Sequence, residues 1–441
     1  MPEPVDLVVP NVTEFNVRNP TVGLEPVLTS GIVQFGEHKA DYAVFWSFRP
    51  RVLVLPAGYD RLWFDDVHSA LRLDPPPVVS PAKRTGLVAR DLLRDGPGQA
   101  RLRELLAGRP VRLVSWGATP EIYLIASLLR GWGLTVELDG AEEDAYWASL
   151  YLDSKLSCLE LAGQLPQVRV PPGLTVASPT ELRGALRRLL ARHRQVVVRS
   201  MYGVGGDGSV VVGVGDQRAF WDTLQQDPFL RVFPLTVQQF VEHAPGIGCP
   251  AVDLRVADGG LREVTLTAMN VDVVRVSGVT VGPGSLGPPY AGQVLEVAEQ
   301  VGAVAHELGF RGWLCVDCLV GTDGVLYLTE INARRSGAMA AISLLGRMPA
   351  GHTAASHDAI PVPTRRPVSY RHHLRPAFQR LWEAGLPAYP TSVRGLRFRQ
   401  PVFAAMAVAG TAAEADRVVG GMAEEVSRAL GPAAAPGRAR P

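Results

Sequence analysis

The chain has 441 residues, a formal net charge of +1 and 47% hydrophobic residues. This length accommodates several domains of about 100–200 residues each, and the hydrophobic fraction is enough to build their cores. Because the net charge is close to zero, the chain has no excess of basic residues to neutralise the phosphate backbone of a nucleic acid. Nucleic acid is therefore not an expected partner. The first residues do not form a secretory signal, and no run reaches the ~18–20 apolar residues of a membrane span, so we predict a cytoplasmic protein without membrane contact.

Strands and helices alternate in the first third of the chain. Strand-like runs at Gly31–Phe35 and Ala43–Phe48 come first. Strands are then predicted at 51–55, 111–116 and 134–138, with helices at 60–71, within 84–107 and at 119–130. A strand, a helix and a strand within about thirty residues predict a βαβ unit and therefore a parallel sheet. We expect an N-terminal α/β domain over residues 1–140, without the glycine pattern of a dinucleotide site.

The remaining chain divides into a core, a linker and a small unit. Helices are predicted at 142–152, 154–163 and 179–194, within a core that spans residues 141–345. The Gly-, His- and Pro-rich segment 346–367 is predicted to be a linker. A small C-terminal α/β domain is expected over 368–430, followed by a disordered tail at 431–441.

A hairpin near residue 320 carries the strongest functional signal. Strands are predicted at Trp313–Val320 and Val325–Ile331, because β-branched, aromatic and aliphatic residues flank a turn-forming Gly-Thr-Asp-Gly segment. Positions three apart on a strand point to opposite faces, so Cys315 and Cys318 are not expected to share a metal or a disulfide.

The register of this hairpin brings two carboxyl groups to one face. With Val320 opposite Val325, Asp317 and Glu330 are diagonal neighbours with Cβ atoms roughly 7–8 Å apart, and Asn332 continues on the same face. Oxygen ligands of this kind suit a hard cation, and Mg²⁺ in particular when phosphate oxygens complete its shell. The alternative is a surface hairpin whose acidic side chains point to water.

A glycine-rich hairpin is predicted at Gln195–Val212. Its glycines let the backbone approach phosphates and point successive N–H groups at them, and Arg199 at the end of the incoming strand can reach the same phosphates. No Gly-Lys-Ser/Thr opens a helix here, so this is not a P-loop. An ordinary hairpin is the alternative. The loop glycines are Gly203, Gly205, Gly206 and Gly208.

Two weaker signals lie on either side of this hairpin. Leu235–Val241 is predicted to be a strand whose backbone could bond an adenine edge, although most such strands are plain core. Lys155 stands at a predicted helix start, where a cation is mildly unfavourable unless an anion lies nearby. A solvated surface lysine is the alternative there.

The order of these features resembles the ATP-grasp superfamily over Asp153–Gly337, and the segment Glu330–Arg334 is its most specific part. The resemblance implies an α/β fold with a pre-ATP-grasp domain, a two-subdomain core that binds ATP and Mg²⁺, and an accessory domain. It also implies residue roles. Asp317, Glu330 and Asn332 would hold Mg²⁺, and Arg334 would stabilise charge on the transferred phosphoryl group. Nucleotide contacts would come from Lys155, Arg199, Gly205, Gly206, Gly208, Gln238, Gln239, Phe240 and Val241, with backbone bonds to adenine at Gln239 and Val241.

The resemblance further implies a carboxylate–amine ligase. A small amino-acid-like carboxylate would be activated as an acyl phosphate, and a peptide or other amine would then attack it. The layout is also similar to the peptide ligases of pheganomycin biosynthesis, which implies a role in peptide antibiotic production. Arg255 is the further catalytic candidate, with Arg275, Arg335 and Ser336 as weaker candidates for a substrate carboxylate. A homodimer is one option. Ligation of another small carboxylate and amine, or a non-catalytic ATP-binding module, are the alternatives.

Overall fold

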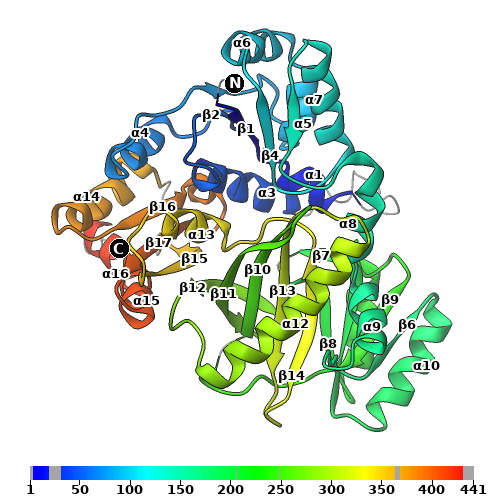
Figure 1. Cartoon of the computed structure of the whole chain (residues 1–441). Helices are drawn as coiled ribbons and strands as arrows, with labels where there is room; N and C mark the ends of the chain where they lie inside the picture. The colour runs from blue at the N-terminus through cyan, green and yellow to red at the C-terminus, as the bar shows by residue number, and fades with distance from the viewer. Residues whose placement is uncertain (1–2, 19–30, 205, 248, 363–367, 431–441) are drawn as a thin grey trace, which may run out of the picture.

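The computed structural model describes residues 3–18, 31–204, 206–247, 249–362 and 368–430. The predicted loop residue Gly205 and the predicted disordered tail at 431–441 lie outside these ranges. In the described part of the chain the strands form sheets of five, eight and four strands (Figure 1).

The five-stranded sheet is parallel and lies at the top of Figure 1, as the βαβ prediction required. Its order is β3-β2-β1-β4-β5, and the fully buried strand β1 is central. Its strands are β1 (Val5–Val9), β2 (Arg51–Val54), β3 (Val78–Val79), β4 (Val111–Ser115) and β5 (Val136–Leu138). Its helices are α1 (Val12–Asn16), α3 (Ile32–Ala40), η1 (Asp41–Phe45), α4 (Arg61–Ala70), α5 (Val88–Leu93), α6 (Gly96–Leu106) and α7 (Pro120–Gly131).

The strand-like runs near the N-terminus were predicted wrongly. The run at 31–35 lies in α3 and the run at 43–48 begins in the 3₁₀ helix η1. Short apolar runs do not distinguish a buried helix from a strand by periodicity. Here α3 and η1 lead directly into one another and bury their apolar side chains against other elements.

The four-stranded sheet is antiparallel, with order β6-β9-β7-β8. The predicted glycine-rich hairpin is its β7–β8 pair, and α10 lies on its outer side (Figure 1). Its strands are β6 (Gly173–Val176), β7 (Gln195–Val204), β8 (Asp207–Gly213) and β9 (Leu235–Gln239). The helices before and within it are η2 (Glu143–Ala145), α8 (Tyr146–Leu152), α9 (Lys155–Gln164), α10 (Pro179–Leu190) and α11 (Gln217–Gln226).

The eight-stranded sheet is antiparallel, with order β14-β13-β10-β11-β12-β15-β17-β16. Its strands are β10 (Cys249–Ala257), β11 (Gly260–Asp272), β12 (Arg275–Val281), β13 (Gly312–Val320), β14 (Leu326–Asn332), β15 (Thr353–Pro361), β16 (Ala388–Ser392) and β17 (Val402–Ala409). Its helices are α12 (Pro288–Glu307), α13 (Met339–Leu345), η3 (Tyr370–Leu374), α14 (Arg375–Glu383), η4 (Arg394–Arg397), α15 (Ala412–Gly420) and α16 (Met422–Leu430).

The eight-stranded sheet contradicts the prediction of a linker at 346–367. Thr353–Pro361 forms β15, which pairs with β12 on one side and β17 on the other. The C-terminal strands therefore extend the sheet that carries β13 and β14. The domain boundaries near residues 140 and 345 stay predictions.

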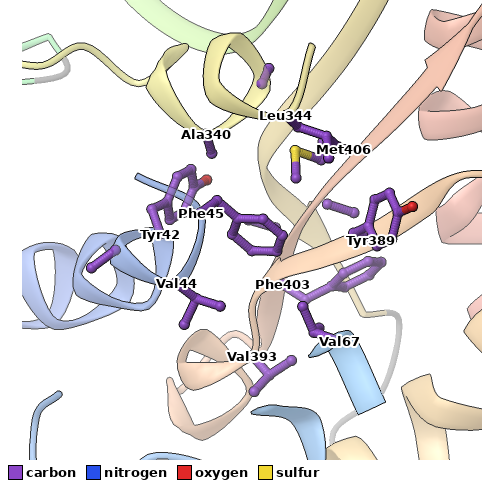
Figure 2. Packing of buried hydrophobic residues seen from close by; sticks show 14 of the residues in the cluster. Tyr42, Val44, Phe45, Val67, Ala340, Leu344, Tyr389, Val393, Phe403 and Met406 are labelled. Carbon is purple, nitrogen blue, oxygen red and sulfur yellow. The ribbon is translucent and has the colours of Figure 1, made fainter. Parts of the chain in front are cut away.

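One hydrophobic core joins the N-terminal part of the chain to the C-terminal strands. Figure 2 shows Phe45 from η1 close to Leu344 of α13 and Phe403 of β17. The indole of Trp63 on α4 donates to the carbonyl of Pro390 on β16 at 2.8 Å. The N-terminal helices η1 and α4 and the C-terminal strands β16 and β17 are thus packed together. Within the described residues, no helix combines the length and the apolar character required to cross a membrane.

Candidate active site

The predicted functional hairpin is formed by β13 and β14, but its register differs from the prediction. Val320 pairs with Leu326, and a bulge beside Asp317 shifts the pairing so that Asp317 faces Glu330 directly. The bulge inserts one extra residue on β14, which a local pattern does not reveal. Directly opposite residues have Cβ atoms about 4.5–5.5 Å apart. The two carboxyl groups are therefore closer than predicted, and Asn332, opposite Cys315, lies on the same face.

The Asp317 carboxylate is enclosed by polar neighbours. Its Oδ2 accepts a hydrogen bond from Asn332 Nδ2 at 2.8 Å, and its Oδ1 accepts one from Cys315 Sγ at 3.1 Å. Burial, and then the negative charge of Glu330, raise the pKa of Asp317 to about 7. A cation between the two carboxyl groups would relieve both effects.

Glu330 is held by two cations. Lys155 at the start of α9 donates to its Oε1, and Arg199 Nη2 on β7 donates to its Oε2 at 3.2 Å. Burial favours the neutral form, but the charges of Lys155 and Arg199 outweigh it and hold the pKa of Glu330 below its usual value. The anion expected near Lys155 is thus a carboxylate of the chain itself.

Arg334 lies at the edge of the same cluster. Its Nη2 donates to Asn332 Oδ1 at 2.7 Å and its Nη1 to the carbonyl of Arg335 at 2.8 Å. The guanidinium Cζ lies 5.0 Å from the ring centre of Trp116 and 5.9 Å from that of Phe15. Both aromatic residues come from the parallel-sheet region, and sequence reasoning missed them because nothing local marks them.

A cavity of about 460 Å³ brings most of the predicted residues together. It lies between the four-stranded and the eight-stranded sheets, which both contribute to its lining. From the predicted set it is lined by Lys155, Arg199, Gly206, Gln238, Gln239, Phe240, Val241, Asp317 and Glu330. An apolar wall from β11, β12 and their turn was missed by sequence reasoning, although its alternating pattern was visible. This wall consists of Met269, Val271, Val273, Val274 and Val276.

The glycine-rich loop lines this cavity at Gly203 and Gly206. Gly206 has φ +100°, and a Cβ there would lie 2.7 Å from the carbonyl oxygen of Val274. Only glycine therefore allows the loop to approach the β11–β12 turn this closely. Gly208 (φ +73°) packs against Ser200 and Phe229 and is not among the residues that line the cavity.

In the strand predicted to bond an adenine edge, part of the backbone is already hydrogen-bonded within the protein. The N–H of Gln239 already donates to the carbonyl of Pro172 at 2.8 Å, and the N–H of Phe240 donates to Gln195 at 3.1 Å. The Gln238 side chain donates to the carbonyl of Pro171 at 3.2 Å. Of the two backbone positions predicted for a base edge, Val241 therefore remains the candidate for an N–H contact.

The structure does not bring Arg255 to the cavity. It lies further along β10 and donates to Asp139 at 2.7 Å and to Glu263 at 3.3 Å. Arg335 is also turned away, since its buried guanidinium donates to Asp139 and to the carbonyl of Ser115. Both arginines join β5 of the parallel sheet to the eight-stranded sheet, which sequence spacing could not show.

The three sheets and the cavity between two of them define the ATP-grasp fold. N5-carboxyaminoimidazole synthase from Aspergillus clavatus, in complex with ADP and 5-aminoimidazole ribonucleotide, has this fold with a TM-score of 0.55 and 11% identity, over 97% of this chain and 99% of that one. The L-amino acid ligase from Bacillus licheniformis matches with a TM-score of 0.53 and 11% identity, over 96% and 98% of the two chains.

A third similar structure is that of the biotin carboxylase–β,γ-ATP complex from Campylobacter jejuni. It has a TM-score of 0.55 and 11% identity, over 98% of this chain and 96% of that chain. No protein-family model and no curated relative matches the sequence. At these identities the likeness is one of fold.

Proposed function

We propose that this protein is an ATP-dependent ligase that joins a carboxylate to an amine. One observation carries the proposal. The facing carboxyl groups of Asp317 and Glu330 share a cavity with Lys155 and Arg199, below a glycine-rich loop. Cations and backbone N–H groups suit the phosphates of ATP, and the carboxyl pair suits the metal that accompanies them.

The donor set fits Mg²⁺ bound together with a polyphosphate. Asp317, Glu330 and Asn332 would hold the ion, and the raised pKa of Asp317 marks a place where a positive charge is favourable. Among the described residues, no three His, Cys, Asp or Glu side chains are placed to hold a metal by themselves. Phosphate oxygens would therefore complete the shell, as is usual for Mg²⁺. When bound, Mg²⁺ neutralises phosphate charge.

The proposed reaction has two steps. A carboxylate oxygen of the first substrate attacks the γ-phosphorus of ATP, and ADP leaves with the bonding electrons. An amine then attacks the acyl carbon of the acyl phosphate, and inorganic phosphate leaves as the amine loses a proton. Lys155, Arg199 and Arg334 would neutralise charge during the first step. The loop at Gly206 would exclude water, which otherwise hydrolyses the acyl phosphate.

The narrower proposal is that the amine substrate is an amino acid or a peptide, as in the peptide ligases that the sequence resembles. The fold shared with an L-amino acid ligase supports it. A place in peptide antibiotic biosynthesis and an assembly as a homodimer belong to this narrower proposal. Ligation of another small carboxylate and amine is the second candidate, supported by the shared fold of the N5-carboxyaminoimidazole synthase.

Hydroxylamine trapping tests the proposal. The protein is incubated with Mg-ATP, hydroxylamine and single carboxylates, and hydroxamate, ADP and phosphate are measured. Hydroxamate that depends on one carboxylate and on ATP is the expected result. Tight ATP binding without turnover on any carboxylate would contradict ligation and favour a non-catalytic ATP-binding module.

A further inference from the structure

Buried N–H groups without acceptors lie around the segment that follows Arg334. Among the described residues, Asn16 Nδ2, Lys39 Nζ, Trp46 Nε1 and Trp116 Nε1 have no hydrogen-bond partner, although each residue is at most 5% exposed. Buried donors are hydrogen-bonded in the great majority of cases. These four donors are therefore places where acceptor atoms from outside the chain, of water or of a ligand, can bind.

Ring contacts place two of these donor residues, Trp46 and Trp116, beside Arg334 and Arg335. The rings of Trp46 and Trp116 are 5.7 Å apart, and Trp116 is the aromatic residue 5.0 Å from the Arg334 guanidinium. Asn16 follows Phe15, whose ring is also near Arg334. Trp46 and Trp116 therefore belong to the part of the parallel-sheet region that faces Arg334 and Arg335, and Asn16 is next to this part in sequence.

Lys39 lies at the far end of the same segment. Its Nζ is 3.6 Å from where a Cβ on Gly337 would stand, and three residues of chain span at most about 10 Å from Arg334. Nζ lies 2.6 Å from Asp358 Oδ2 as an ion pair, but without the geometry of a hydrogen bond. Asp358 Oδ1 accepts from Tyr42 at 2.5 Å. Asp358 is therefore held in place while the ammonium donors of Lys39 remain unused.

Two other cations in this region are already hydrogen-bonded. Arg335 donates to Asp139 and to a backbone carbonyl, and Arg18 donates to Asp153 and to the carbonyl of Phe15. An ammonium has three donors and can serve a second carboxylate beside its first. Arg18 and Arg335 each keep one unpaired Nε, whereas no donor of the Lys39 ammonium is in a hydrogen bond. Lys39 is thus the cation of this set with the most donors left for a ligand.

We infer that Lys39 binds the free carboxylate of the amine substrate, which lies along Arg334–Gly337 with its reacting amine at the Arg334 end. This inference rests on the proposed ligase function. These four donors require a ligand with acceptor atoms, and an anion suits Lys39. The segment Arg334–Gly337 spans at most about 10 Å, which at about 3.3–3.6 Å per residue limits the peptide beside it to about three residues.

The side chain of Asp358 is 23% exposed and Gly337 is half-buried, so the pair borders solvent. A peptide carboxylate can therefore reach Lys39 without unfolding the core. Peptides longer than three residues would continue outward past Asp358.

The test uses the full-length protein with a carboxylate donor found by hydroxylamine trapping. Ala-Ala and Ala-Ala-Ala are compared with their C-terminal amides as amine substrates. Variants are Lys39→Met with Asp358→Asn, which removes both charges of the pair, and Lys39→Arg, which keeps the cation. Lys83→Met, at an exposed lysine, is the matched control. Hydroxylamine carries no carboxylate, so hydroxamate formation reports the first step alone.

In the wild type we expect the free acids to be preferred over the amides by about 10- to 100-fold in kcat/KM, the effect of one charge-assisted hydrogen bond. The double variant should lose this preference through KM, while its hydroxamate rate stays within about twofold of the wild type. Lys83→Met should keep the preference, and Lys39→Arg should keep most of it.

Equal use of acids and amides by the wild type, or a preserved preference in the double variant, would overturn the inference. Absence of hydroxamate with every donor would instead defeat the proposed function. In that case, binding of Ala-Ala and of its amide to the wild type, measured by calorimetry, tests the carboxylate site on its own. Selective binding of the acid that is lost in Lys39→Met supports the site, and equal or no binding refutes it. If the double variant fails to fold, Lys39→Arg and the wild-type comparison remain decisive.

Discussion

Glu330 is the residue on which the charges of the site converge. It faces Asp317 and accepts hydrogen bonds from Lys155 and Arg199, so it links the carboxyl pair to the two phosphate-binding candidates. In the free protein this carboxylate organises the two cations, and in the proposed reaction it would also bind the metal that accompanies the nucleotide.

Glu330→Gln should abolish turnover while the fold persists. The amide keeps the shape of the side chain, but it removes the charge that a metal requires and leaves Lys155 and Arg199 without their counter-ion. We expect kcat to fall on the order of 100-fold or more. ATP-dependent phosphate release measures the loss, and circular dichroism checks the fold. Full activity in this variant would remove Glu330 from the site.

Glu14, on α1, shows how burial alters an acid away from the site. Its Oε1 accepts from the N–H groups of Ala89 and Arg90 at 2.7 and 3.2 Å, while its Oε2 is buried without a partner among the described residues. Burial raises the pKa of Glu14 to about 7. The folded state therefore holds a proton that the unfolded chain releases above its ordinary pKa of 4.5.

The stability contributed by this proton is complete below about pH 4.5 and is lost as the pH rises through about 7. Glu14→Gln carries its hydrogen at every pH. The free energy of unfolding of the variant, measured by urea denaturation, should therefore rise relative to that of the wild type as the pH increases from 5 to 8. Glu104→Gln, at an exposed residue of α6, controls for the loss of one negative charge. A constant difference for Glu14→Gln across this range would contradict the assignment.

At the scale of elements, two hairpins from different sheets close the cavity. The β7–β8 loop meets the β11–β12 turn at Gly206 and Val274, and both turns line the cavity. Where a loop approaches another backbone this closely, a larger side chain at the contact would clash. This contact couples the glycine-rich loop to the apolar wall of the cavity.

Gly206→Ala should weaken ATP binding more than it weakens the fold. The new Cβ would meet the Val274 carbonyl at 2.7 Å, and φ +100° is a region that L residues rarely adopt. We expect KM for ATP to rise by about tenfold, since strain of about 1–3 kcal/mol is typical of such positions. Gly184→Ala on α10, where nothing lies within 4 Å of a new Cβ, is the matched control and should be neutral or stabilising. An unchanged KM for ATP in Gly206→Ala would mean that the loop does not close on nucleotide.

At the scale of the whole molecule, Asp139 joins two sheets. It stands at the end of β5, almost fully buried, and pairs with Arg335, with Arg255 at 2.7 Å and with Arg112 at 3.6 Å. Burial opposes its charge, but these three arginines hold the pKa of Asp139 below its usual value. The carboxylate therefore anchors the segment after Arg334 to the parallel sheet.

Asp139→Asn should be strongly destabilising, because it leaves three guanidinium groups without their shared anion. The expected loss in free energy of unfolding is about 3–5 kcal/mol, as for other broken buried ion pairs. Chemical denaturation measures it. Asp258→Asn, which breaks an exposed pair with Arg311, should change stability by no more than about 0.5 kcal/mol. A loss of similar size in both variants would show that Asp139 is not a structural anchor.

Local sequence determined many of the elements and which residue types meet in the candidate site. The strands β13 and β14, the glycine-rich hairpin, and the side chains of Glu330, Asn332 and Arg334 follow from patterns within a few residues, because turn residues and alternating side chains act over short distances. The parallel βαβ arrangement followed from the same rules.

Only the tertiary structure decided what pairs across the chain. The bulge beside Asp317, the place of β15 inside the large sheet and the attachment of Arg255 to Asp139 depend on partners far away in sequence. Burial and charge balance select those partners, and they are properties of the packed molecule. The same holds for Phe15, Trp116 and Lys39, which reach the segment after Glu330 from the first 120 residues of the chain only once the sheets have assembled.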